Sequence, residues 1–148
     1  MELIAKLTDT KERTLEFFEL PEVDLGKTYG DGKWNIRQIL NHLADAETVL
    51  YERIRRAISK PGQVIWAFDQ DAWADKLRYN QFPLPINKEI YGSVRTSIIY
   101  LADEYYETLG ENEFVHSETG IRTLKDEFDK VAGHNQHHLN QIAKALSR

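Results

Sequence analysis

Apolar residues recur at helical spacing in four separate segments of this 148-residue chain, and this pattern restricts the fold more than any other feature. No segment sustains the alternation of apolar and polar residues that a half-buried strand shows. A helix with one apolar face has to bury that face against another element. We therefore predict an all-α protein in which four helices form a bundle.

Residues that start or stop helices mark the ends of the first two predicted helices. The first helix begins its apolar face at Ile4 and is predicted to end at Pro21, because proline cannot continue a helix interior. The second helix is predicted to begin after Asn35, since Asn35 and Gln38 have the spacing of a capping box. Pro61 and the glycine that follows it stop this helix.

The last two predicted helices are bounded in the same way. The third follows the segment "PLPIN" (83–87), and Gly110 suits the position just after its end. The fourth begins near Thr123, with Asp126 at the capping-box spacing. The residues predicted to face the interior are Ile4, Leu7, Lys11 (through its aliphatic stem), Leu15 and Phe18, then Ile36, Ile39, Leu43, Leu50, Ile54 and Ile58, then Ile90, Val94, Ile98, Leu101 and Tyr105, and finally Leu124, Phe128, Val131, His138, Ile142 and Ala145.

The connection between the second and third helices, residues 61–85, is long and has a short helical pattern of its own at "DQDAWADKLRY" (69–79). A connection of this length can run along the whole bundle, so we expect parallel second and third helices in up-down-down-up order. Its aromatic residues either cover the open side of the bundle or line a substrate pocket. These residues are Trp66, Phe68, Trp73, Tyr79 and Phe82.

Composition limits the functional classes. The length and a hydrophobic content of 41% suit one globular domain over residues 1–148. No apolar run reaches the roughly 18 residues of a membrane span, and the N-terminal segment is too charged for a signal peptide, so we expect a cytoplasmic protein with no membrane partner. A net charge of −5, with "RIRRA" (53–57) as the one basic run, argues against nucleic acid. Without cysteine, a metal site needs His, Asp, Glu or water.

Three of the five histidines lie within "GHNQHHLNQIA" (133–143), in the last predicted helix. At about 100° per residue, His134 and His138 lie one turn apart on the inward face, whereas His137 points about 100° away from His138. Each inward imidazole must find partners for its polar nitrogens. A metal ion would satisfy this pair, and so would ordinary hydrogen bonds.

His42 is the only histidine of the second helix and is predicted to face inward with Ile39 and Ala46. It lies about 9 Å inside the start of its helix, while His134 and His138 are centred about 16 Å before the end of theirs. In an antiparallel pair of helices these levels can meet. The three histidines are therefore a candidate metal site.

Three stretches together resemble the DinB-like (YfiT-related) superfamily: "WNIRQILNHLADAE" (34–47), "DQDAW" (69–73) and "GHNQHHLNQI" (133–142). The resemblance spans nearly the whole chain. It implies a four-helix bundle in up-down-down-up order, in which His42, His134 and His138 hold a divalent metal ion. Members with an assigned activity include thiol-dependent transferases that use bacillithiol or mycothiol, and a related isomerase. Homodimers are frequent among them, so we also expect a homodimer here.

Three neutral imidazoles leave at least one coordination position of a metal ion for water or substrate. At that position a water can be acidified or a thiol held as thiolate. We therefore expect a metal-dependent enzyme, either a thiol S-transferase or a hydrolase, whose partner is a small molecule such as a low-molecular-weight thiol. The alternative is a non-catalytic, metal-stabilised bundle or a small-molecule binding module. Zinc is the first expectation, and nickel, iron, manganese and cobalt also suit imidazole ligands.

Five other polar residues have simpler expected roles. Asp45 is expected to be solvated or to form an ion pair within its helix rather than to orient an imidazole. Gln141 and Asn135 are candidates for hydrogen bonds to the histidines. Glu47 is expected to be structural, and His116, in the polar segment "GENEFVHSETG" (110–120), is expected to lie on the surface. No catalytic base is identified.

Overall fold

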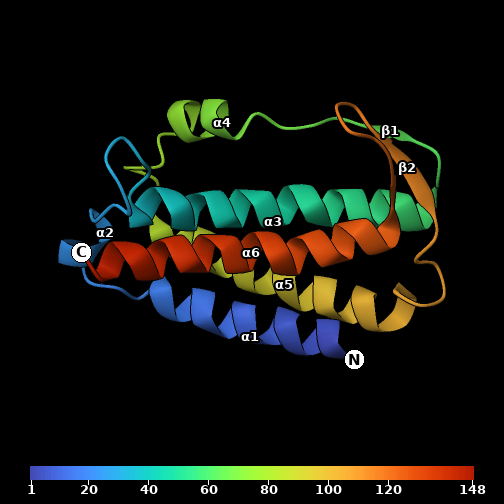
Figure 1. Ribbon diagram of the computed structural model, residues 1–148, viewed down its shortest axis with the longest axis horizontal. Helices are drawn as coiled ribbons and strands as arrows, with labels where there is room; N and C mark the ends of the chain where they lie inside the picture. Colours follow the sequence, from blue (N-terminus) through green and yellow to red (C-terminus); the bar gives the residue numbers. More distant parts are fainter.

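The computed structural model describes residues 1–148 and confirms a bundle of four long helices (Figure 1). Its order is up-down-down-up, since α3 and α5 run in the same direction and α1 and α6 run opposite to them (Figure 1). Each helix packs against two others: α3 contacts α5 and α6, and α1 contacts the same two helices. The long helices are α1 (Glu2–Phe17), α3 (Ile36–Ser59), α5 (Leu84–Tyr105) and α6 (Leu124–Leu146), and two short helices, α2 (Glu22–Leu25) and α4 (Gln70–Lys76), lie in connections.

Both predicted capping boxes are present, at the starts of α3 and α6. The Asn35 side chain accepts a hydrogen bond from the Gln38 amide, and the Gln38 side chain accepts one from the Asn35 amide. Thr123 and Asp126 exchange the same pair of bonds. These bonds satisfy amide groups that a helix start otherwise leaves without partners. The two helices that carry the predicted metal ligands therefore have defined starting points.

The connection between α3 and α5 runs back along the outside of the bundle, over α3, as Figure 1 shows. The helical pattern predicted in this connection is confirmed as α4, whose first turn is capped by Asp69 through the Ala72 amide. The connection after α5 was expected to begin at Gly110, but α5 ends at Tyr105. Gly110 lies instead in a tight turn, where a Cβ atom would stand 2.1 Å from the Tyr106 carbonyl oxygen. Only glycine fits there.

A three-stranded sheet at one end of the bundle was not predicted. Its strand order is β1-β2-β3, with β1 parallel to β2 and β2 antiparallel to β3. The sequence showed no strand because strands of two to four residues are too short to display an alternating pattern. The sheet joins the start of the connection between α3 and α5, called the crossover below, to the hairpin of β2 and β3 that leads into α6. The strands are β1 (Val64–Ile65), β2 (Glu113–His116) and β3 (Gly120–Thr123).

The apolar core consists of two clusters of buried residues, one of 13 and one of 11, and a polar layer lies between them on every long helix. This layer corrects the predicted inward faces of α1 and α5. Ile90 is 38% exposed, whereas Arg95 is fully buried, because the interior offers Arg95 hydrogen-bond acceptors. The polar layer consists of Thr10 and Thr14 of α1, Glu47 of α3, Arg95 of α5 and Asn135 of α6.

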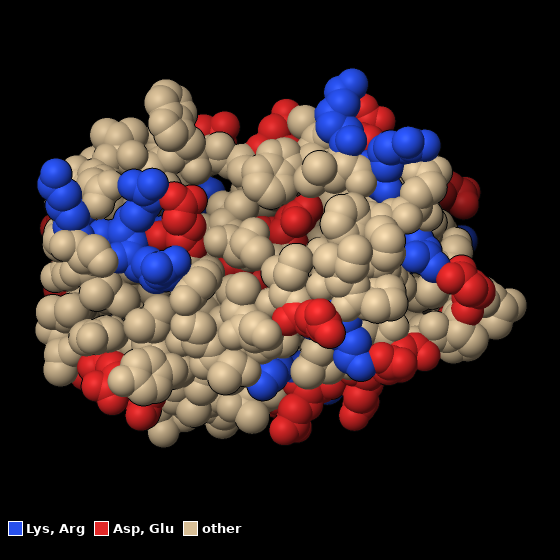
Figure 2. Space-filling view, turned by 180° about the vertical axis from the view of Figure 1, so that it is seen from behind, with Lys and Arg blue, Asp and Glu red and all other residues tan.

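The surface carries mixed charge. On the face seen from behind in Figure 2, Lys and Arg side chains are interspersed with Asp and Glu. None of the helices combines the length and the apolar character that a membrane-spanning segment needs.

Candidate metal centre

The structure brings together the three histidines that the sequence analysis singled out. Nε2 of His134 lies 3.1 Å from Nε2 of His42 and 3.1 Å from Nε2 of His138. One potential ligand atom from each of the three lies within 4.8 Å of the others. Their levels match because α3 and α6 are antiparallel, as the predicted depths required.

Aromatic rings hold His42 in place. His42 is fully buried, and its ring lies 5.0 Å from the ring centroid of Trp34 and 6.2 Å from that of Phe68, with which it is stacked. Trp34 precedes the α3 capping box, and Phe68 belongs to the crossover. Trp73 of α4 in turn packs edge-on against Phe68. Of the aromatic residues between α3 and α5, Phe68 therefore packs on His42 with Trp73 behind it, while Trp66, on the same segment, is 79% exposed.

Gln141 determines the protonation of His138, so the hydrogen bond proposed for it from the sequence is present. Its Oε1 atom lies 2.8 Å from Nδ1 of His138, and its Nε2 atom lies 3.2 Å from Nε2 of His137. An amide oxygen can only accept, so Nδ1 of His138 carries the proton. The Nε2 atom of His138 is then an unprotonated nitrogen that faces the other two histidines.

Burial keeps the three imidazoles neutral. Burial, together with a smaller effect of the neighbouring histidines, lowers the pKa of His42 to about 2 and that of His134 to about 3. The pKa of His138 is also lowered by burial, against the opposing effect of its bond to Gln141. Neutral imidazole is the form that binds metal ions.

The donor set fits a divalent cation. His134 Nε2 has two nitrogen neighbours, yet a neutral imidazole has at most one proton to share there. One cation between the three Nε2 atoms would satisfy lone pairs that the histidines cannot satisfy among themselves.

Two hollows border His134. One, of about 360 Å³, is bordered by His134 and His138 together with Trp34, Gln70 and Asp71. The other, of about 270 Å³, extends from His134 toward the sheet. Sequence reasoning missed Asp71 as a residue of the site, although it lies inside the quoted stretch "DQDAW".

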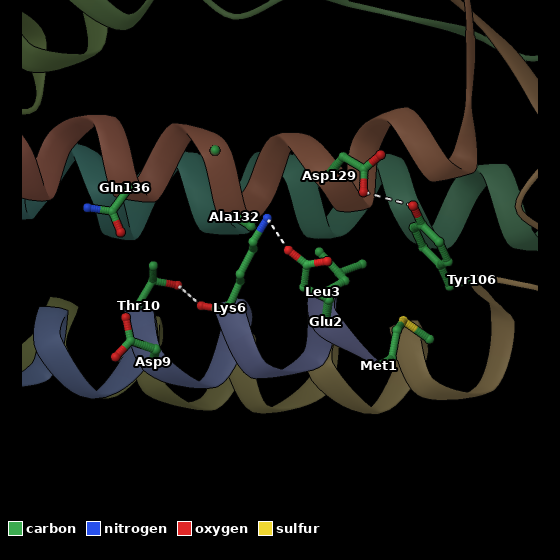
Figure 3. Close-up of a pocket in the computed structure, with 11 residues that line it drawn as sticks. Met1, Glu2, Leu3, Lys6, Asp9, Thr10, Tyr106, Asp129, Ala132 and Gln136 are labelled. Carbon is green, nitrogen blue, oxygen red and sulfur yellow. Dashed lines mark hydrogen bonds and ion pairs between the residues drawn. The ribbon is translucent and has the colours of Figure 1, made fainter.

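A further hollow, of about 660 Å³ between α1 and α6, contains none of the three histidines. Figure 3 shows that it is lined by surface polar pairs, in which Lys6 contacts Glu2 and Tyr106 donates to Asp129. It has no group of metal ligands, so it is not the candidate site.

Other sequence expectations are corrected. Asp45 neither pairs along its helix nor contacts a histidine; it accepts a hydrogen bond from the Tyr79 hydroxyl. His116 is buried on β2, not on the surface, because the hairpin that covers it was not predicted. Asn135 bonds to Arg95 and does not contact the histidines. Glu47 is structural as expected, but its partner is Arg95 of another helix.

These features define a class: a four-helix bundle whose interior presents three convergent histidines from two antiparallel helices. The sequence profile of the DinB superfamily matches residues 6–142. This chain therefore belongs to the DinB superfamily.

Individual relatives agree with this assignment. The chain is 32% identical over 128 residues to "Putative metal-dependent hydrolase OB0413" of Oceanobacillus iheyensis, across 86% of this chain and 73% of that protein. It is 26% identical to "Putative metal-dependent hydrolase BH0277" of Halalkalibacterium halodurans, across 87% and 75% of the two chains. The structure of YfiT from Bacillus subtilis superimposes with a TM-score of 0.90 at 21% identity, across 99% of this chain and 85% of that one. That structure is described as a probable metal-dependent hydrolase with an unusual four-helix bundle topology, and at this identity it supports the fold.

Proposed function

We propose that His42, His134 and His138 bind one divalent metal ion, and that the protein is a metal-dependent hydrolase of a small molecule. The convergence of three Nε2 atoms beside a hollow carries this proposal. The names of the relatives, which call them metal-dependent hydrolases, support it. Zinc is our first choice of metal, and nickel, iron, manganese or cobalt would also suit three imidazoles.

The chain's own residues supply binding and proton transfer. A divalent ion held by three imidazoles would leave a position open and would acidify a water or bind a thiolate there. Asp71 is the carboxylate that borders the hollow with His134 and His138, and we assign it to accept the proton. Gln141 keeps His138 in the tautomer whose Nε2 atom can bind the ion.

Thiol S-transfer is the second candidate. Two carboxylates of α3, those of Asp45 and Glu47, are occupied by Tyr79 and Arg95, which leaves few proton acceptors near the histidines. A thiolate bound to a metal ion needs no separate base to keep it ionised. Because the chain has no cysteine, that thiol would come from a small substrate. A homodimer remains a prediction from the family resemblance, and light scattering tests it.

The first experiment measures metal content. Protein purified without a histidine tag, stripped with chelator and reconstituted with zinc should hold about one ion per chain by elemental analysis. A screen with simple esters and amides, and a second with activated electrophiles plus thiols, then separates the two reactions. A stoichiometry near zero would overturn the metal centre. Full occupancy without turnover in either screen would favour a non-catalytic, metal-stabilised bundle.

A further inference from the structure

Arg53 of α3 is a buried arginine with few hydrogen bonds. Its side chain is 3% exposed, yet its Nη2 atom reaches only the Trp66 carbonyl at 3.4 Å. Its Nη1 atom lies 3.8 Å from the Glu127 carboxylate, and its Nε atom has no partner. A guanidinium group has five N–H donors, and a buried donor without a partner costs free energy. Arg53 therefore has donors available for a ligand.

These donors border the hollow of about 270 Å³ that extends from the histidines toward the sheet. Lys130 of α6 also lines it, half-buried, and its ammonium group makes no ion pair within 4 Å. His116 lines it too, and its Nδ1 atom accepts hydrogen bonds from two backbone amides at 3.1 Å. Because Nδ1 is an acceptor, neutral His116 carries its proton on Nε2 and is a donor there. Three side chains with free donors thus surround one small space.

The charge of this hollow indicates the kind of ligand. Glu127, buried behind Arg53, offsets the Arg53 charge, and the one acidic residue that lines the hollow, Glu118, is exposed and screened by water. Lys130 acts on the same carboxylate, so Arg53 and Lys130 together face one buried negative charge, which leaves one positive charge in excess. Burial lowers the pKa of its ammonium group, Glu127 opposes this effect, and Arg53 lowers that pKa further. One uncompensated positive charge suits a monoanion better than a phosphate dianion.

The hollow lies against the candidate metal centre, because His134 lines it. Lys130 precedes His134 by one helical turn, about 6 Å along the axis. On α3, the small residue Ala46 lies between the levels of His42 and Arg53 and also lines the hollow. Because His134 and Arg53 both line this one hollow of about 270 Å³, a small ligand inside it can reach from His134 toward the Arg53 donors.

We propose that this hollow is a carboxylate subsite, in which Arg53, Lys130 and His116 bind the carboxylate of a short substrate whose reactive group lies at the histidines. The placement of the reactive group rests on the proposed metal function. The three carboxylate contacts require no metal ion. The substrate class is therefore a small carboxylic acid that carries the hydrolysable or thiol group within a few bonds of its carboxylate.

Two thiols of equal carbon number test this subsite on the zinc-loaded protein. Calorimetry should show 3-mercaptopropionate binding about 10- to 100-fold more tightly than 1-propanethiol, the scale of hydrogen bonds to a charged group. Arg53→Gln and Lys130→Gln should each reduce this preference. Arg56→Gln and Lys144→Gln, at exposed positions of the same two helices, should keep it. Equal affinity for the two thiols in the unmodified protein would overturn the proposal.

A metal-free titration separates this proposal from the proposed function. Propionate should shift the His116 side-chain NMR signals saturably in metal-free protein, and Arg53→Gln should abolish the shift. If the protein binds no metal, this result still decides the subsite. Should Arg53→Gln fail to fold, Lys130→Gln decides it, because Lys130 is only half-buried. No saturable shift, or tighter binding of inorganic phosphate than of propionate, would overturn the carboxylate assignment.

Discussion

The bundle contains two buried arginine–glutamate pairs that differ in how well they are bonded. Arg95 donates to both oxygens of Glu47, at 2.8 and 2.6 Å. Its other N–H groups donate to the Leu7 carbonyl at 3.0 Å, to Thr10 at 2.8 Å and to Asn135 at 2.7 Å. This polar layer joins all four long helices, and each of its charged groups has its partners inside the protein.

The pair of Arg53 and Glu127 has almost none of these bonds. Its closest contact is 3.8 Å, and neither oxygen of Glu127 has a hydrogen-bond partner. The other buried polar atoms without partners are Nδ1 of His42 and Nε of Arg53 and Arg122, so all of them lie in the region of the histidines and the sheet. The Arg95–Glu47 pair, whose hydrogen bonds are complete, thus stabilises the fold. The Arg53–Glu127 pair, whose hydrogen bonds are incomplete, leaves donors for a ligand.

Breaking the complete pair should have the largest effect. Arg95→Met is expected to lower the free energy of unfolding by about 3 to 5 kcal/mol, because Glu47 is left buried without its cation. Arg53→Met should cost about 2 kcal/mol or less, since its bonds are long and Glu127, whose pKa burial raises, can take up a proton. Urea unfolding of both metal-free variants measures the difference. Equal losses would contradict the comparison.

Substitutions in the region of the histidines and the sheet, called the open region below, should reduce metal binding instead of stability. His42→Ala, His134→Ala and His138→Ala should each weaken zinc affinity by more than about 100-fold, because each removes a ligand, whereas contacts around a ligand are worth about 10- to 100-fold. His137→Ala should have at most that smaller effect, and His116→Ala none. Zinc titration by calorimetry decides this.

The contrast between the adjacent residues His137 and His138 is the most informative part of that series. If His137→Ala loses zinc while His138→Ala keeps it, the assignment of the inward face of α6 is wrong. The metal-free variants should stay folded, because both apolar clusters are untouched. Added zinc should raise the melting temperature of the unmodified protein and of the His116 and His137 variants, but not that of the three variants that lack a ligand, because zinc stabilises only a folded state that binds it.

The histidines also predict a pH dependence of the metal-free protein. Burial lowers the pKa of His42 to about 2 and that of His134 to about 3, against about 6.5 in an unfolded chain. Below pH 6.5 the unfolded state therefore binds more protons, and the free energy of unfolding falls as the pH decreases toward the folded pKa values. Each histidine should contribute a loss of roughly 2 kcal/mol between pH 6.5 and pH 5.

Urea unfolding at pH 7, 6 and 5 tests this dependence. His42→Gln should make it shallower, because one of the protonation events is removed. His137→Gln, at an exposed position of α6, is the matched control and should leave it unchanged. The same slope in His42→Gln and in the unmodified protein would contradict the explanation.

The starts of α3 and α6 could be predicted from the sequence because the signals for them are local. Asn35 and Thr123 cap their helices through neighbours three residues away, so their role is written in four consecutive residues. The inward face of α5 could not be predicted in this way. From the sequence, an arginine at position 95 is expected on the surface. It can be buried because Glu47, from another helix, supplies its counter-charge. The sheet depends on segments about 50 residues apart, which no local pattern reports.

The histidines were predictable because residues four apart share a helix face, and the depth of His42 could be matched to theirs. Arg53 and Lys130 carried a similar signal that was not used. Arg53 follows His42 by 11 residues, about three turns, and Lys130 precedes His134 by four, so both lie on the faces of the candidate ligands. The burial of Arg53 and His116 depends on the crossover and the hairpin, and sequence spacing does not report how these segments pack.

Gln141 gives the smallest and most selective test of the comparison. Gln141→Ala should weaken zinc binding by about 10-fold, because His138 loses the acceptor that holds its proton on Nδ1. Gln141→Glu should retain or increase the affinity, since a carboxylate accepts the same hydrogen bond and makes the imidazole a stronger ligand. Asn135→Ala is the matching substitution in the polar layer. It should lower the free energy of unfolding and leave zinc affinity unchanged, because Asn135 bonds to Arg95 and Thr14 and not to a histidine. Calorimetry and urea unfolding of the three variants measure both quantities. If Asn135→Ala changed zinc affinity as much as Gln141→Ala does, the polar layer and the open region would be energetically coupled. The distinction between them would then be wrong.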